Sequence, residues 1–121
     1  MIECLSVGLG GALGAVLRYL VGLAPLPGQG GFPLATLAVN VLGAFAIGGI
    51  TAAAAKNPAA SPALVLFLRT GLCGGFTTFS TFSLESHQLL SAGKTGAAAC
   101  YMLLSLGLCL AAVWAGGRLA A

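Results

Sequence analysis

The stretch Gly74-Gly75-Phe76-Thr77-Thr78-Phe79-Ser80-Thr81-Phe82 lies inside a long apolar segment and decides how the chain folds. Its two glycines lose the most backbone entropy in a helix, so an unwound turn is least unfavourable at Gly74 and Gly75. The four hydroxyl side chains between its three phenylalanines can satisfy the backbone groups that such a turn releases. In lipid these groups need a partner within the protein, and breaks of this kind often hold ions. The stretch therefore predicts a transmembrane helix that is broken at Gly74-Gly75, near the bilayer midplane.

The composition around this stretch is that of a membrane protein. Only 6% of the 121 residues are charged, 59% are hydrophobic, and the mean hydropathy is +1.05. A soluble domain has about a quarter charged residues, so this chain has too few to cover a surface that faces water. The five basic residues are scattered, which argues against a nucleic-acid partner. We predict a multi-pass protein of the inner (cytoplasmic) cell membrane, surrounded by the lipid bilayer.

Four apolar segments have the length of about 20 residues that a membrane-spanning helix needs. Proline-containing or glycine-containing turns separate them. We predict a single all-α transmembrane domain over residues 1–121, with helices at about 4–24, 34–55, 62–90 and 95–117. The chain starts without a basic region or a cleavage site, so we expect the first helix to be retained. Four spans place both termini on one side of the membrane.

The basic residues near the span ends are divided evenly between the two sides. Lys56 and Arg118 lie on the side of the termini, whereas Arg18 and Lys94 lie on the other. This balance gives almost no positive-inside bias. It predicts dual topology, in which copies insert both ways and pair as an antiparallel homodimer; a topology set by other features is the alternative. Small residues at four-residue spacing would allow close helix packing, and they are Ser6, Gly10 and Gly14, Ala44 and Gly48, Gly71 and Gly75, and Gly107 and Ala111.

Strongly polar side chains within the spans mark the candidate site, because polar groups at this depth usually face a cavity or a partner. Asn40 is too deep and too short to reach water. Arg18 and Arg69 are close enough to helix ends to snorkel, as an alternative to an inward role. Two polar tracks follow helical spacing: Thr78, Thr81 and Glu85 in the third span, and Tyr101, Ser105 and Cys109 in the fourth.

Phe79 and Phe82 alternate with these hydroxyl groups. Core packing is the usual role of phenylalanine, but a core would not need threonine, serine and glutamate on the adjoining faces. The edge of an aromatic ring carries the positive end of its quadrupole. Two ring edges in a narrow, dry passage can therefore solvate a small anion without a formal charge that would trap it.

In these features the chain resembles the Fluc (CrcB) family of fluoride channels. Three motifs in chain order carry the resemblance: GGALGAVLRY at residues 10–19, ATLAVNVLG at residues 35–43, and GGFTTFSTFS at residues 74–83. Together with the length and the four spans, the similarity covers the whole chain. Two positions differ from the family pattern. Ala35 stands where relatives often have glycine, and Cys109 stands where another hydroxyl is expected in the fourth-helix track.

The resemblance implies a passive fluoride channel that is an antiparallel homodimer with two pores and a central structural sodium ion. Phe79 and Phe82 would contact fluoride, with each pore drawing on both subunits. Asn40 would orient or hydrogen-bond at the pore, and Arg18 would belong to an electropositive vestibule. The backbone carbonyls of Gly74 and Thr77 from both chains would hold the sodium ion. The implied polar path consists of Thr78, Ser80, Thr81, Glu85, Tyr101 and Ser105.

Two other functions fit parts of the sequence. A small dual-topology multidrug or cation exporter needs an ionisable carboxyl group inside the membrane, and only Glu85 could provide it. A non-transporting assembly subunit would not require the interrupted stretch. We do not expect an enzyme, because the sequence shows no nucleophile with a base and an orienting group, and it has no nucleotide motif.

Overall fold

The computed structural model describes residues 1–26 and 31–121, and within these ranges every regular element is helical. The first two spans are α1 (Ile2–Gly22) and α2 (Leu34–Lys56). The described residues contain four helical stretches long and apolar enough to cross a membrane, which confirms the predicted all-α class with four spans. The chain is thus a multi-pass membrane protein. The third span consists of α3 (Pro62–Leu66), the π-helix η1 (Phe67–Cys73), α4 (Gly74–Phe76) and α5 (Phe79–Ser91), and the fourth is α6 (Thr95–Ala120).

Prolines and one glycine set the ends of several helices. Pro33 precedes α2, and Pro62 occupies the first turn of α3, where a missing N–H does no harm. The C-terminus of α5 is closed by Gly93, which has φ +76°. The N–H of Gly93 donates to the carbonyl of Leu90 (3.0 Å), and the N–H of Lys94 donates to the carbonyl of Leu89 (2.9 Å). This is a Schellman closure, and it leads the chain directly into α6.

The third span is interrupted at two threonines and not at the two glycines. Thr77 and Thr78 have extended backbones (φ −83°, ψ 158° and φ −150°, ψ 123°). Gly74 has helical angles (φ −64°, ψ −38°), and both Gly74 and Gly75 belong to α4. The prediction of an unwound turn at Gly74-Gly75 is therefore wrong in position. The reason lies in packing, because Gly75 is in contact with α1.

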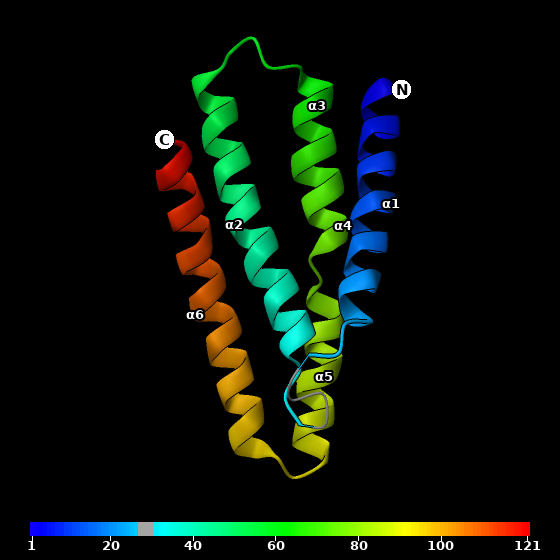
Figure 1. Cartoon of the computed structure of the whole chain (residues 1–121), viewed down its shortest axis with the longest axis vertical. Coiled ribbons are helices and arrows are strands. Elements are labelled where there is room, and N and C mark those ends of the chain that lie inside the picture. The colour runs from blue at the N-terminus through cyan, green and yellow to red at the C-terminus, as the bar shows by residue number, and fades with distance from the viewer. Residues whose placement is uncertain (27–30) are drawn as a thin grey trace.

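Two helix pairs build the molecule: α1 packs against η1 and α4, and α2 packs against α6 (Figure 1). A Cβ atom on Gly75 would meet the carbonyl oxygen of Gly11, and one on Gly48 would meet the carbonyl oxygen of Val113. Most of the small-residue spacing in the sequence is thus used for contacts within one chain, although Gly107 has open space in front of it. Both termini lie at the same end of the molecule (Figure 1).

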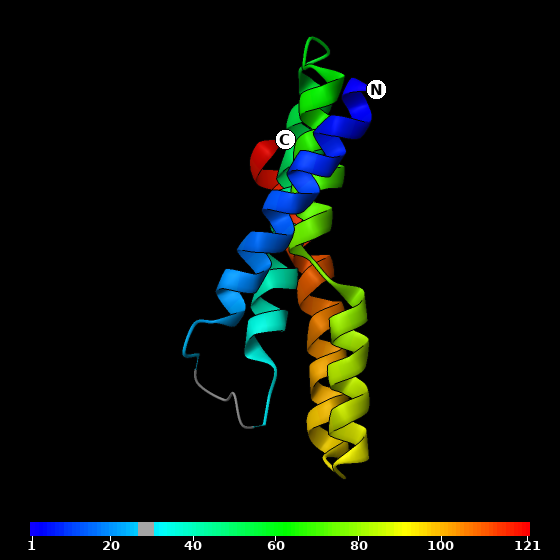
Figure 2. The same ribbon diagram turned by 90° about the vertical axis from the view of Figure 1, so that its right-hand side faces the viewer.

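The buried core lies at the other end, among the first turns of α2, α5 and the first turns of α6. Tyr101 is fully buried and packs with Leu37, Leu89 and Ala98. Outside this core, large apolar side chains such as Leu9 and Leu103 point outward, as expected for helices in hydrocarbon. Figure 2 shows that α1 and the start of α2 diverge there from α5 and α6.

Candidate functional site

Asn40 holds the extended backbone of the third span. Its Nδ2 donates to the carbonyl oxygen of Thr78 (3.0 Å), and its Oδ1 accepts from the N–H of Thr78 (2.8 Å). An asparagine amide has the donor and acceptor that an extended residue needs on one edge. Both bonds join α2 to Thr78, whose extended backbone cannot form the hydrogen bonds of a helix. Asn40 therefore fixes where α4 ends and where α5 begins.

Thr78 is the N-cap of α5. Its hydroxyl accepts from the N–H of Thr81 (3.2 Å) and donates to the hydroxyl of Thr81 (3.1 Å). A hydroxyl at this position satisfies one of the N–H groups that a helix start leaves open. Ser80 lies 3.3 Å from the same hydroxyl. The polar side chains at the start of α5 are thus joined into one group.

Glu85 connects three helices. Its Oε1 accepts from the hydroxyl of Thr36 in α2 (2.8 Å), and its Oε2 accepts from the hydroxyl of Tyr101 in α6 (2.7 Å). Thr36 is 9% exposed and Tyr101 is fully buried, so both donors are withdrawn from solvent. Because bonds to a carboxyl group are among the stronger side-chain hydrogen bonds, this arrangement fixes α5 against its neighbours.

Four aromatic rings follow one another through the site. The ring centroids are 5.4 Å apart for Phe79 and Phe82, 5.2 Å for Phe82 and Tyr101, and 5.5 Å for Tyr101 and Phe32. Phe32 meets Tyr101 edge to face, at 82°. These separations are in the range at which ring quadrupoles interact. Phe79, at one end of the series, is 78% exposed.

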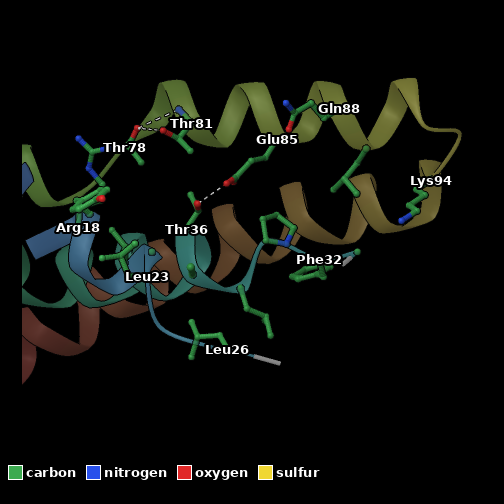
Figure 3. A pocket seen from close by; sticks show the side chains of 18 of the residues that line it. Arg18, Leu23, Leu26, Phe32, Thr36, Thr78, Thr81, Glu85, Gln88 and Lys94 are labelled. Atoms are coloured by element: carbon green, nitrogen blue, oxygen red, sulfur yellow. Dashed lines mark hydrogen bonds between the residues drawn. The ribbon is translucent and has the colours of Figure 1, made fainter. Parts of the chain in front are cut away.

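A polar cavity of about 720 Å³ opens on one side of α5, between α1, α2 and α5 (Figure 3). Arg18, Thr78, Thr81, Glu85 and Lys94 belong to its lining. The Nε of Arg18 donates to the carbonyl oxygen of Gly75 (3.1 Å). In a continuous helix that carbonyl would accept from residue 79, so the arginine replaces a bond that the interruption removes. Arg18 thus links the cavity to the interruption.

A second cavity of about 430 Å³, here called the aromatic cavity, lies toward α6. Phe79 and Phe82 line it, together with Asn40, Ser105 and Cys109. The hydroxyl of Ser105 is buried and, among the residues that the structure describes, has no hydrogen-bond partner. A buried polar group without a partner is rare and calls for a ligand, water or another chain. Thr78 lines both cavities and therefore stands between them.

The structure brings most of the predicted site residues together. Gly74, Thr77, Thr78, Phe79, Phe82, Asn40 and Ser105 line the aromatic cavity, and Arg18, Thr78, Thr81 and Glu85 line the polar cavity. Tyr101 reaches the site through Glu85. Ser80 is exposed and lines neither cavity.

Thr36 and Phe32 were not among the predicted site residues. Thr36 precedes Asn40 by four residues, so the two share a helix face, and this spacing was a usable signal. Phe32 precedes α2 and reaches Tyr101 only through the fold, so its role had no local signal.

Comparisons with known proteins identify the family of this chain. Residues 5–117 match the family model described as CrcB-like protein, Camphor Resistance (CrcB). A protein of Rhizobium meliloti (strain 1021) named fluoride-specific ion channel FluC is 50% identical over 117 residues, which cover 96% of this chain and 94% of that protein. Proteins with the same name from Agrobacterium fabrum and Geobacter sulfurreducens are each 48% identical, with the same coverage. These names describe an ion channel and not an enzyme, and they favour the predicted channel over the exporter. The chain belongs to the CrcB family, as its three motifs predicted.

Proposed function

We propose that this protein is a passive, fluoride-selective channel of the cell membrane. The observation that carries the proposal is the convergence of Phe79, Phe82 and the buried Ser105 hydroxyl, which has no partner among the described residues, on one cavity in a chain whose relatives are named fluoride-specific channels. Ring edges and a hydroxyl donor offer a small anion several weak contacts and no opposite charge. Such a site can bind the ion and still release it.

The anion path runs from the polar cavity past Thr78 to the aromatic cavity. Arg18 attracts the anion, and the hydroxyl groups of Thr78, Thr81 and Ser105 replace part of its water shell; Ser80, Glu85 and Tyr101 complete the polar path. An interior-negative potential of 100 mV contributes about 2.3 kcal/mol per charge. A tenfold concentration ratio corresponds to about 1.4 kcal/mol. This potential therefore keeps the fluoride concentration inside the cell roughly 40-fold below that outside, without any other energy source.

The functional unit is an antiparallel, dual-topology homodimer with two pores. Phe79 lines the aromatic cavity and is 78% exposed in the single chain, which supports a second copy that covers its ring. The even division of basic residues between the two ends permits insertion both ways. Tags at both termini, probed from each side of the membrane, test this arrangement. A single orientation for all copies would exclude dual topology.

A structural sodium ion at the dimer centre would be held by the carbonyl oxygens of Gly74 and Thr77. In the part of the chain that the structure describes, the helical donors of both carbonyls are engaged elsewhere: the N–H of Thr78 binds Asn40, and the N–H of Thr81 binds the hydroxyl of Thr78. The described residues also contain no cluster of His, Cys, Asp and Glu side chains for a transition metal. Neutral oxygen ligands suit a hard cation, so the donor set fits. The bound ion would supply positive charge near the anion path.

Fluoride efflux from liposomes containing the purified protein tests the proposed function directly. We expect efflux of fluoride with little chloride. Phe79→Ile and Phe82→Ile should fold and lose most of this flux, because isoleucine keeps apolar bulk but has no ring edge. Phe45→Ile is the matched control, since Phe45 is a partly exposed α2 residue that lines neither cavity. Near wild-type flux in both cavity variants would show that the rings only pack.

A further inference from the structure

We propose that Cys109 makes the aromatic cavity a binding site for one soft, thiophilic metal ion, with Hg²⁺ as the probe, and that the bound metal blocks the anion path. The block rests on the proposed channel function, whereas the metal binding does not. Cys109 belongs to none of the three motifs, and it stands in the fourth-helix track at the position where a hydroxyl was expected.

Cys109 lies on the wall that α6 contributes to the aromatic cavity. Ser105 precedes it by four residues, so the two side chains share one face of the helix. Both residues line the cavity, and Cys109 is partly exposed. The thiol is therefore accessible from a space of about 430 Å³ that also borders the rings of Phe79 and Phe82.

The hydroxyl of Ser105 is a second and independent indication that a ligand binds here. The side chain is 7% exposed, and its hydroxyl has no hydrogen-bond partner in the described part of the chain. Buried polar atoms are nearly always paired, so this one calls for a partner that the single chain does not supply. It lies one helical turn from the thiol, where it can donate to a chloride that the metal retains.

The donor set selects the class of metal. Sulfur is a soft ligand, whereas a hydroxyl at the same position would offer a hard oxygen. Of the described residues that line the aromatic cavity, none carries a formal charge, which favours a neutral species such as HgCl₂. In the binding step the thiol proton passes to water, an S–Hg bond forms, one Hg–Cl bond breaks and chloride leaves. No atom is oxidised or reduced.

Cys73 lines the same cavity and provides an internal comparison. It is 4% exposed and belongs to η1, which packs chiefly on α1, whereas α6 packs chiefly on α2. The two thiols thus reach the cavity from separate helix pairs, and the accessible one is Cys109. Free cysteine usually acts as a small apolar side chain, and that role predicts no metal on the folded protein.

The first measurement is metal binding, and it does not depend on transport. The protein is reconstituted with Cys4→Ser and Cys100→Ser, because both of these cysteines are exposed and line neither described cavity. It is treated with HgCl₂, freed of excess reagent and only then unfolded for measurement of its intact mass. We expect one mercury per chain. Adding Cys109→Ser or Cys109→Ala should abolish the adduct, and adding Cys73→Ser should preserve it.

The second measurement is fluoride efflux from the same liposomes, expressed relative to each variant before treatment. The Cys4→Ser/Cys100→Ser protein should lose most of its flux in HgCl₂ and regain it in dithiothreitol, whose two thiols remove the metal. The variants that also lack Cys109 should keep their flux.

An absent mercury adduct, or inhibition that persists without Cys109, would overturn the inference and leave the channel function standing. Mercury bound at Cys109 with undiminished flux would refute the block. Mercury binding at Cys109 in a protein that shows no fluoride flux before treatment would refute the proposed function and support the metal site.

Discussion

The two halves of the third span are held in place by different means. Before the interruption, η1 and α4 contact α1 backbone to backbone, through glycines such as Gly71 and Gly75. After it, α5 is held by side chains: Asn40 binds its first turn, and Glu85 binds Thr36 and Tyr101. The first half therefore leaves no space at its contact with α1, whereas the second half carries side chains that border both cavities.

The first half of the span therefore supports the structure, and the second half carries the functional side chains. Close backbone packing by small residues is the usual way in which membrane helices fix one another, since lipid gives them no hydrophobic reason to associate. Side-chain hydrogen bonds position α5 without close backbone contact, and they leave hydroxyl groups and aromatic rings facing the two cavities. We expect mutations in the first half to act on folding, and mutations in the second half to act increasingly on conduction.

The largest expected effect is that of Gly75→Val. A Cβ atom there would lie within 3.0 Å of backbone atoms of Gly11, and backbone cannot move aside as a side chain can. We expect little or no monodisperse protein in size-exclusion chromatography, because overpacking typically costs about 1–3 kcal/mol, and more where rigid backbone blocks the new side chain. Gly8→Val is the control, since Gly8 is a helical glycine of α1 and nothing lies within 4 Å of its Cβ position. A Gly75→Val protein that melts as the wild type does would contradict the backbone contact.

Asn40→Ala should have the next largest effect. It leaves the N–H and the carbonyl of Thr78 without partners, and each unsatisfied buried group costs about 1–3 kcal/mol. We expect a clearly lower melting temperature in detergent and loss of most fluoride flux, because the start of α5 is no longer fixed. Asn57→Ala removes a bond to the N–H of Ala59 in an exposed turn and should change stability by only about 0.5 kcal/mol. Equal melting temperatures for the two variants would argue against the role of Asn40.

Tyr101→Phe tests the contact between α5 and α6 on a smaller scale. It removes one of the two donors to Glu85 and keeps the ring contacts with Phe82 and Phe32. We expect a loss of about 1–2 kcal/mol in the free energy of unfolding, because one carboxyl oxygen is left without its donor. Tyr19→Phe, at a position that is 67% exposed, should leave stability unchanged. If both substitutions behave alike, the bond to Glu85 does not contribute to stability.

The same comparison explains what could be predicted from the sequence. The low charge and the lengths of the apolar segments were enough to predict the four spans, because both can be read directly from the order of residues. Backbone entropy predicted the unwound turn at Gly74-Gly75. The contact of Gly75 with α1 outweighs that preference, and the helix is interrupted at Thr77 and Thr78 instead.

The hydrogen bond between Tyr101 and Glu85 could not be predicted from the sequence either. The two tracks were visible in the sequence, but their relative register depends on the turn at Gly93. The hydrogen-bond partners of Asn40 could not be predicted because they lie in the interruption, which the sequence predicted at the wrong residues. Its depth in the membrane indicated a buried role, but not that both amide atoms bind a backbone.

The smallest expected effect on stability, and the sharpest separation of stability from flux, comes from Ser105→Ala. The side chain is only 7% exposed, and its hydroxyl has no partner among the described residues. Replacing an unsatisfied hydroxyl with a methyl group removes a desolvation penalty, so we expect an unfolding free energy that is unchanged or higher by about 1 kcal/mol. Flux should nevertheless fall, because the aromatic cavity loses its donor from α6. Ser86→Ala is the matched control: Ser86 is 6% exposed, and its hydroxyl donates to the carbonyl of Phe82 (2.7 Å) within α5. That variant should leave flux intact. If Ser105→Ala instead lost stability and kept its flux, the hydroxyl would be part of the packing, and the second half of the span would be as closed as the first.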